Sequence, residues 1–276
     1  MTWNDAAITF AVCRVPGKKR IIMNMAAAQA ILSTLILGLL YYRMVKRETP
    51  LQISWLQALT PIGLGIAALL VSFYAFIGVS FVINWLGISA GDAPLFVKSM
   101  LFAFMVAGCP EELTKLCAML IAIFLFRKKI RNVYEYILIG AAVGIGFTIW
   151  EEFLYGEEGA VAWFRLLTLA GHMVYGILMA RHLGTARYNK INDRPRFLQY
   201  VLAIAVPVLL HTPYDACTGN NLIMLSDDPA AQDTGIIIGL IATAVHFVGQ
   251  FVILYMVKKH TEKYCGMSVL GTEQEK

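Results

Sequence analysis

The chain has 276 residues, of which 58% are hydrophobic and only 15% are charged. A soluble domain carries roughly 25% charged residues and about 45–50% apolar ones, so this apolar excess is too large for one soluble core. The net charge of +5 is modest, and in a membrane protein such charge mostly marks loops on the cytoplasmic side. The composition therefore predicts an integral membrane protein that contacts the lipid bilayer and has no nucleic-acid partner.

Seven apolar segments are long enough to cross a bilayer, which requires about 20 mostly apolar residues. In chain order they are 24–42, 57–87, 95–126, 134–155, 161–181, 198–218 and 234–257. We expect an all-α fold, a polytopic transmembrane bundle of 7–8 transmembrane helices. A single transmembrane domain (24–257) would follow an N-terminal segment (1–23) and precede a short cytoplasmic tail (258–276).

The segment 95–126 is longer than one crossing requires, and it contains Gly108-Cys109-Pro110. Proline suits the first turn of a helix and disrupts a helix interior. We expect a break here, with a new helix that begins at about Pro110 and an eighth helix if the segment forms two pieces. Glu111 and Glu112 would then lie in a first turn, where the helix dipole favours negative charge.

The distribution of lysine and arginine in short loops predicts the orientation. The basic segments are 43–47, 127–131, 181–196 and 258–263, and the neutral or acidic ones are 88–93, 156–160 and 219–233. Alternation of these loops places the C-terminus in the cytoplasm and the N-terminus outside. The basic stretch 14–20 disagrees with this assignment, whereas the loops that follow it agree with one another.

Several ionisable side chains lie inside the apolar segments. They are Glu111, Glu112 and Lys115 in PEELTK, Glu151 and Glu152 in GFTIWEEFLYG, His172 in AGHMVYG, and His211 and Asp215 in LLHTPYDA. A charge in hydrocarbon costs roughly 2.5–3.5 kcal/mol on insertion scales and marks function by default. Under the predicted topology four segments carry these groups at similar depths in the outer half, with His172 nearer mid-membrane, which indicates one shared site.

Spacing predicts some of the contacts in this site. Glu111 and Lys115 are four residues apart and can pair on one helix face, whereas Glu112 would point about a quarter-turn away. His211 and Asp215 have the same spacing, so Asp215 could orient His211 or share its face toward a substrate. We expect Lys115 to be a structural or tuning partner and not a nucleophile.

These residue types are suited to peptide hydrolysis, which needs an activated water and a group that stabilises the oxyanion. A carboxylate buried in apolar surroundings beside a second carboxylate can act as a base near neutral pH. Alternatively, two histidines and a glutamate can hold zinc or another divalent metal with one position open for water. The metal ligands would be His172, His211 and Glu111. The chain has no HExxH and no GxSxG motif, so a standard zincin helix or serine elbow is absent.

The order of these motifs resembles the PrsW family of intramembrane peptidases, which is distantly related to the type II CAAX prenyl endopeptidases (CPBP family). The matching segments are EELTK (111–115), GFTIWEEFLY (146–155), GHMVYG (171–176) and HTPYD (211–215). They follow in the family's order, although Glu152 stands where the family's second motif has asparagine.

The resemblance implies an intramembrane protease of a bacterial cell membrane that cleaves membrane-anchored protein substrates, with anti-sigma factors as the family's known type of substrate. It implies that Glu111 and Glu112 are essential and that His172 and His211 are their partners. It leaves open whether the enzyme is a metalloprotease or uses a glutamate base without metal.

Two other functions remain compatible with the sequence. A non-catalytic membrane scaffold of the same fold would bind partners, but this chain retains all four motifs. A proton-coupled transporter could use intramembrane glutamate, histidine and aspartate as a proton relay. Transporters often show internal repeats and paired broken helices, whereas this sequence shows one break and no repeat.

The remaining polar residues in or near the apolar segments are expected to be structural. We expect Glu152 to be a helix-end charge and Arg165 to snorkel or pair near the outer interface. We expect His246 to form a bond between helices. His182 and His260 lie in basic segments and are expected to be solvated.

Overall fold

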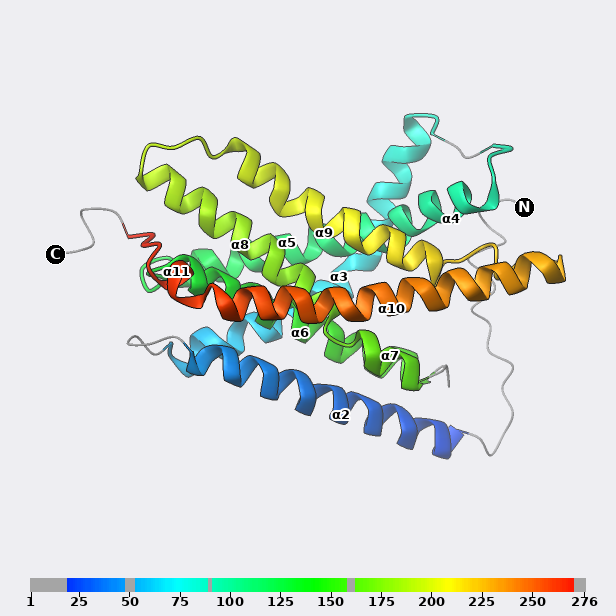
Figure 1. Cartoon of the computed structure of the whole chain (residues 1–276), viewed down its shortest axis with the longest axis horizontal. Helices are drawn as coiled ribbons and strands as arrows, with labels where there is room; N and C mark the ends of the chain where they lie inside the picture. Colours follow the sequence, from blue (N-terminus) through cyan, green and yellow to red (C-terminus); the bar gives the residue numbers. More distant parts are fainter. Residues whose placement is uncertain (1–18, 48–52, 89–90, 158–161, 271–276) are drawn as a thin grey trace.

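The computed structural model describes residues 19–47, 53–88, 91–157 and 162–270, which form a bundle of α-helices (Figure 1). The described helices are α2 (Lys19–Lys46), α3 (Trp55–Trp85), α4 (Leu95–Ala103), α5 (Cys109–Phe126), α6 (Val133–Glu157), α7 (Ala162–Thr168), α8 (Gly171–Ile191), α9 (Phe197–Cys217), α10 (Pro229–Lys259) and α11 (Thr261–Cys265). The described residues contain no β-strand, so the predicted all-α membrane fold is confirmed. Most of the predicted N-terminal segment, the basic residues 14–18, most of the loop 156–160 and the end of the tail lie outside the described residues.

Five described helices are long and apolar enough to cross a membrane, namely α2 from Ala28, α3, α6, α9 and α10. Two further helices, α5 and α8, have 18 and 21 residues. Three charged side chains lie in the first two turns of α5, Glu111, Glu112 and Lys115, and three lie in the second half of α8, Arg181, Arg187 and Lys190. With these two included, the described bundle contains the seven long helices that the sequence predicts.

The expected break before Pro110 is a π-helical turn, Phe104–Gly108, that joins α4 directly to α5. Pro110 does lie in the first turn of α5, but the helical run continues from Leu95 to Phe126 without a loop, so two separate pieces do not form. A Cβ on Gly108 would overlap Thr212 of α9, so the turn packs closely against that helix. Turns of this kind are frequent at functional sites.

The predicted span 161–181 is wrong in its bounds, because the structure has the short α7 followed by α8, which begins at Gly171 and continues to Ile191. Charge marks where an apolar segment ends but not where a helix ends, so much of the basic segment 181–196 is helical. His182, which we expected to be solvated, is only 6% exposed. Its Nδ1 lies 2.8 Å from Oε1 of Gln199 on α9.

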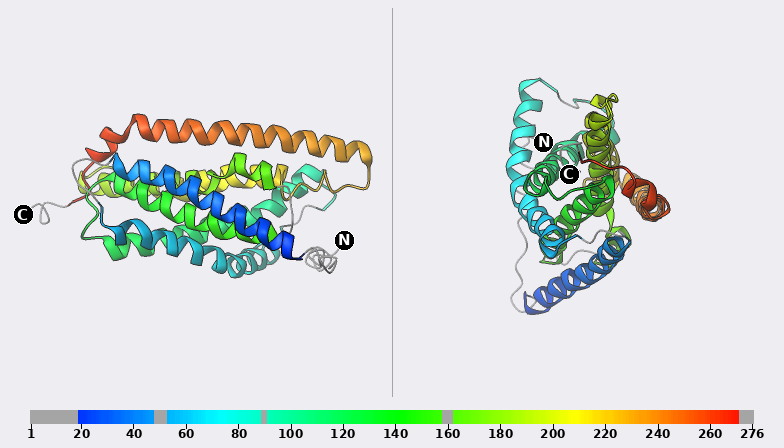
Figure 2. Two further views of the ribbon diagram at one scale, coloured as in Figure 1. Left: turned by 90° about the horizontal axis from the view of Figure 1, so that it is seen from below. Right: turned by 90° about the vertical axis from the view of Figure 1, so that its left-hand side faces the viewer.

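The helix α6 is the centre of the bundle (Figures 1 and 2). Of the residues in its most apolar 18-residue stretch 72% are buried, compared with 6–28% in the corresponding stretches of the other four spans. Its glycines allow close backbone contact. A Cβ on Gly140 would overlap the backbone of α8, one on Gly144 would overlap the carbonyl of His172, and one on Gly146 would overlap the carbonyl of Ile62 on α3. Small residues at helix interfaces are typical of membrane bundles. The glycines of α6 therefore set how closely α8 and α3 approach.

The basic segments gather at one end of the bundle, as the predicted loop alternation requires. In Figure 1 the C-terminal ends of α2, α5, α8 and α10 lie toward the left, the side where the C-terminus of the chain is marked. These ends carry Arg43 and Lys46, Arg127 to Arg131, Arg187 and Lys190, and Lys258 and Lys259. The C-terminal end of α3 and the connection from α9 to α10 lie toward the opposite end.

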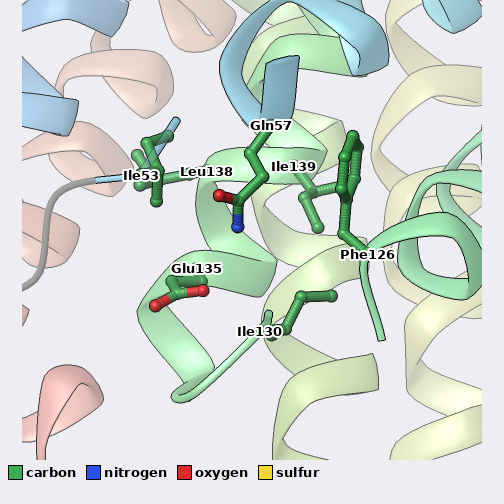
Figure 3. Close-up of a pocket in the computed structure, with 7 residues that line it drawn as sticks. All are labelled: Ile53, Gln57, Phe126, Ile130, Glu135, Leu138 and Ile139. Atoms are coloured by element: carbon green, nitrogen blue, oxygen red, sulfur yellow. The ribbon is translucent and has the colours of Figure 1, made fainter. Parts of the chain in front are cut away.

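A small pocket lies where the start of α3, the end of α5 and the start of α6 meet (Figure 3), and it includes Gln57 and Glu135 in its lining. Its volume of about 10 Å³ suits at most about one water molecule. Gln57 completes the cap of α3 with Ser54, and Glu135 pairs with Arg131 at 2.6 Å. Both polar side chains therefore stabilise helix ends.

Replacing Gly140 with alanine is expected to lower the free energy of unfolding by about 1–3 kcal/mol, because the new methyl group would overlap the Gly176 carbonyl and Ala180. Thermal unfolding of the detergent-purified protein measures the loss. The matched control is Gly38→Ala, since a Cβ at that position on α2 meets open space. Equal stability of the two variants would contradict close packing of α6 on α8.

Candidate active site

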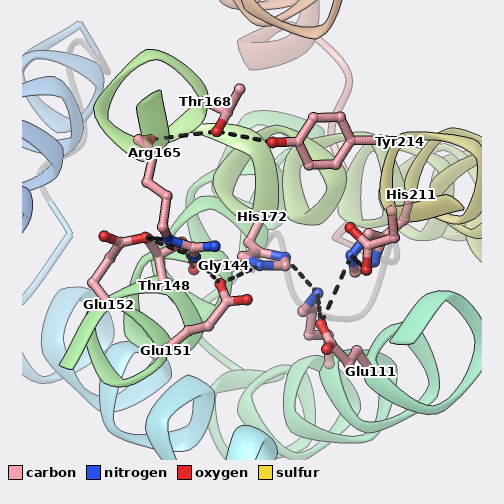
Figure 4. A network of polar contacts seen from close by, with 12 residues as sticks. Glu111, Gly144, Thr148, Glu151, Glu152, Arg165, Thr168, His172, His211 and Tyr214 are labelled. Atoms are coloured by element: carbon pink, nitrogen blue, oxygen red, sulfur yellow. Dashed lines mark hydrogen bonds and ion pairs between the residues drawn. The ribbon is translucent and has the colours of Figure 1, made fainter. Parts of the chain in front are cut away.

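The seven predicted site residues come from four helices and join in one connected network. Figure 4 shows part of it, with Glu111, Glu151, His172 and His211 labelled. They are Glu111, Glu112 and Lys115 on α5, Glu151 on α6, His172 on α8, and His211 and Asp215 on α9. The network lies where α5 and α8 begin and where α6 and α9 approach their ends. Because the chain runs in opposite directions in these helices, all four contribute at one level of the bundle.

Lys115 is the centre of this network. Its Nζ lies 2.7 Å from Oε1 of Glu112 and 3.5 Å from Oε2 of Glu111. The same ammonium donates to Nδ1 of His172 at 2.8 Å. The predicted pairing with Glu111 is thus present, but the expectation that Glu112 points away is wrong. Residues three apart also share a helix face, and the long lysine side chain lies between both carboxylates, with its side chain and that of Glu112 fully buried.

His211 connects α9 to α5. Its Nδ1 donates to Oε1 of Glu112 at 2.9 Å, the same oxygen that accepts from Lys115. Its Nε2 lies 3.5 Å from Asp215 Oδ2 and 3.9 Å from Glu111 Oε2. Asp215 therefore shares a face with His211, as its spacing predicts.

His172 connects α8 to α6. Because Lys115 donates to Nδ1, the other ring nitrogen, Nε2, carries the proton and donates to Oε2 of Glu151 at 2.7 Å. We expected His172 nearer mid-membrane than the other groups, but α8 begins at Gly171 and places it in a first turn. That position brings the imidazole to the level of Glu151.

Glu152, which we expected to be a helix-end charge, is instead buried inside the bundle, where it is only 1% exposed. Its Oε1 lies 2.8 Å from the Arg165 guanidinium on α7, and its Oε2 accepts from Gln29 on α2. The same guanidinium lies 3.3 Å from Oε2 of Glu151. The pairing predicted for Arg165 is confirmed, and this pairing links α7 to both glutamates of α6.

Two tyrosines that border the network, Tyr175 and Tyr214, were missed by the sequence analysis. The ring of Tyr175 lies 5.0 Å from that of His211, and its hydroxyl lies 3.3 Å from Nδ1 of His246 on α10. Tyr214 stacks on His246 at 4.2 Å. His246 thus bonds between helices, as predicted. The signal for the tyrosines was their position inside the motifs GHMVYG and HTPYD, close to each histidine.

Three side chains of the network fit a divalent metal ion. Glu111, His172 and His211 each offer one ligand atom, and these atoms lie within 4.8 Å of one another. Two histidines and a carboxylate are a common catalytic zinc set.

The surroundings of these three side chains support the fit. Each imidazole is held by a carboxylate, Glu112 or Glu151, as metal-binding histidines usually are. Oε2 of Glu111 is buried and has no hydrogen-bond partner among the residues that the structure describes. Since Nε2 of His172 faces Glu151, a metal ion and the Lys115 ammonium would compete for Nδ1.

The fold and the site define a class of protein. It is a helical membrane protein with a buried cluster of glutamates and histidines that fits a divalent cation. Residues 57–257 match the sequence model of the PrsW family intramembrane metalloprotease, and the chain belongs to this family. The resemblance drawn from the four motifs is therefore confirmed.

The similar relatives include three proteins named Protease PrsW. The one from Halalkalibacterium halodurans is 32% identical over 126 residues, which cover 44% of this chain and 56% of the relative. Those from Bacillus subtilis and Shouchella clausii are 32% identical over 120 residues and 35% identical over 118 residues, covering 42% and 41% of this chain and 54% and 52% of the relatives. The chain spans about half the length of the curated relatives it matches. No solved structure matches it.

Arg165→Met is expected to lower the free energy of unfolding by about 2–3 kcal/mol, since it leaves Glu152 buried without its counter-charge. We expect a smaller loss than for a fully buried ion pair, because the Arg165 side chain is 29% exposed. Adding Glu152→Gln should recover part of the loss, which a double-mutant cycle on unfolding midpoints measures. Arg194→Met, at an exposed position, is the control. Strict additivity of the two changes would contradict the pairing.

Proposed function

We propose that this chain is an intramembrane protease that hydrolyses peptide bonds of membrane-anchored protein substrates. The observation that carries the proposal is the convergence of Glu111, Glu112, His172 and His211 in one buried network. Family membership and the protease names of the relatives support it. Buried ionisable groups are costly in a membrane protein and are retained for function.

Within this proposal the two adjacent glutamates have different roles. Oε1 of Glu112 accepts from both Lys115 and His211, so Glu112 holds these side chains in place. Oε2 of each glutamate is buried without a hydrogen-bond partner in the described part of the chain, but the Glu111 side chain is 14% exposed whereas that of Glu112 is fully buried. Glu111 is therefore the glutamate best placed to bind an attacking water or an ion in the site.

We propose that the reaction is metal-dependent, with zinc or another divalent ion held by Glu111, His172 and His211. A bound ion of this kind would supply Lewis-acid polarisation of the water and of the scissile carbonyl. Glu112 and Glu151 would orient the two imidazoles. Lys115, displaced from Nδ1 of His172, would still neutralise Glu112.

We further propose that the site lies in the outer half of a bacterial cell membrane and that the C-terminus is cytoplasmic. The basic segments lie at the end of the bundle opposite to the connection from α9 to α10, and lysine and arginine are enriched in cytoplasmic loops. His211 and Asp215 lie closer to that outer connection. This location suits cleavage from the extracytoplasmic side, as the processing of an anti-sigma-factor-like regulator requires.

Glu111→Gln and Glu112→Gln, made singly, are expected to reduce cleavage of a single-span substrate by about 10²-fold or more in a cell-based assay. Glutamine keeps the shape of the side chain and removes its negative charge, which Glu111 needs to bind the water or ion and Glu112 needs to hold Lys115 and His211. Immunoblots of the membrane fraction show whether the variants accumulate. The control is Glu262→Gln on α11, where the glutamate is exposed.

If both glutamine variants process a panel of substrates as the unchanged protein does, the carboxylates are not catalytic. The non-catalytic scaffold and the proton-coupled transporter then become the better explanations.

The purified protein is expected to bind about one divalent ion per chain, and His211→Ala should lower this content to background because it removes one of three ligands. Elemental analysis by mass spectrometry measures the metal. His260→Ala, outside the network, should retain it. Full substrate cleavage by metal-free protein would instead support a glutamate base that acts without metal.

A further inference from the structure

A second pocket lies at the basic end of the bundle, far along α5 from the candidate active site. Its volume is about 420 Å³. One wall is the last part of α5 with Arg127 and Lys128 beyond it, and the other walls include Tyr136 of α6, Arg187 of α8 and Val269 after α11. This volume is large enough for part of an organic ligand.

The α5 wall changes from apolar to basic along one helix face. Its residues, Leu120, Ile123, Phe124, Arg127 and Lys128, are spaced three and four apart and therefore share that face. Phe124 is 63% exposed and Leu120 is 47% exposed, and Ile123 between them is half-buried. The Arg127 guanidinium donates to the Phe124 carbonyl at 2.9 Å and lies 4.3 Å from the Phe124 ring centre. The cation is thus held directly above the apolar surface.

The opposite wall includes the residues that follow α11, and hydrogen bonds hold their backbone in place. The Val269 N–H donates to the Arg131 carbonyl at 2.8 Å, and Ser268 pairs with Asn132 in a short β-bridge. Arg187 then donates from Nε to the Val269 carbonyl at 3.3 Å. These bonds fix Arg187 at the pocket, while the remaining N–H groups of its guanidinium can bind an anion.

The charges of the pocket have one sign. Three cationic side chains line it, and no carboxylate does so among the described residues. A partner must therefore offer negative charge to the basic end and apolar surface to Leu120, Ile123 and Phe124. Lipids with anionic headgroups have this arrangement, and basic pockets between transmembrane helices on the cytoplasmic side bind such headgroups.

We propose that this pocket binds an anionic phospholipid of the surrounding leaflet. Its phosphate would lie among Arg127, Lys128 and Arg187, and an acyl chain would run along the apolar part of α5. This assignment is independent of the proposed peptidase activity, because the pocket contains none of the residues of the candidate active site.

Native mass spectrometry of the full chain in neutral detergent, titrated with phosphatidylglycerol or phosphatidylcholine, tests the proposal. Phosphatidylglycerol is expected to bind at least about tenfold more tightly, because only its headgroup carries net negative charge. Arg127→Gln combined with Lys128→Gln should weaken its binding by roughly 10- to 30-fold. Both side chains are exposed, so the fold should be retained, and unfolding midpoints check this.

The matched control is Arg43→Gln combined with Lys46→Gln, which removes two exposed cations from the same end of the bundle but outside the pocket. It should leave phosphatidylglycerol binding unchanged. The proposal is overturned if the two lipids bind equally or if both double variants weaken binding to the same extent. Competition by soluble glycerol phosphate at the same concentration would assign the pocket to a free phosphate compound instead of a lipid.

Discussion

The buried ammonium of Lys115 is the interaction on which the candidate active site depends. It contacts Glu112 on its own helix and His172 on α8. Through Glu112 it also fixes His211, and through His172 it fixes Glu151. Removing one partner of a buried ion pair costs about 3–5 kcal/mol, so this arrangement constrains four helices together. The motif residues are thus bound directly to one another.

The backbone of α6 makes this convergence possible. The glycine at 144 allows the first turn of α8 to lie directly against α6, and His172 is in that turn. A larger residue would separate the two helices and lengthen the contact between His172 and Glu151. The π-helical turn before α5 has a comparable effect, because Gly108 allows α9 to approach where α5 presents Glu111 and Glu112. The small residues on these helices therefore determine where the ionisable side chains lie.

The sequence predicted the site well where spacing along one helix decides the contact. The pairs Glu111–Lys115 and His211–Asp215 are examples, and the apolar segments identified the long helices. It failed where a distant partner decides the environment. Nothing local to Glu152 indicates that Gln29 and Arg165 would enclose it. Helix ends were also missed, because hydropathy falls at the first charged residue even where the helix continues, as α8 does.

The extended network contains more acidic side chains than basic ones. Five carboxylates, Glu111, Glu112, Glu151, Glu152 and Asp215, share two permanent cations, Lys115 and Arg165. In hydrocarbon an excess of negative charge has to be balanced by bound protons or by a metal ion. Under the proposed metal binding, uptake of the ion and release of protons would be linked, so acidity and metal supply would act on this protein as opposing controls.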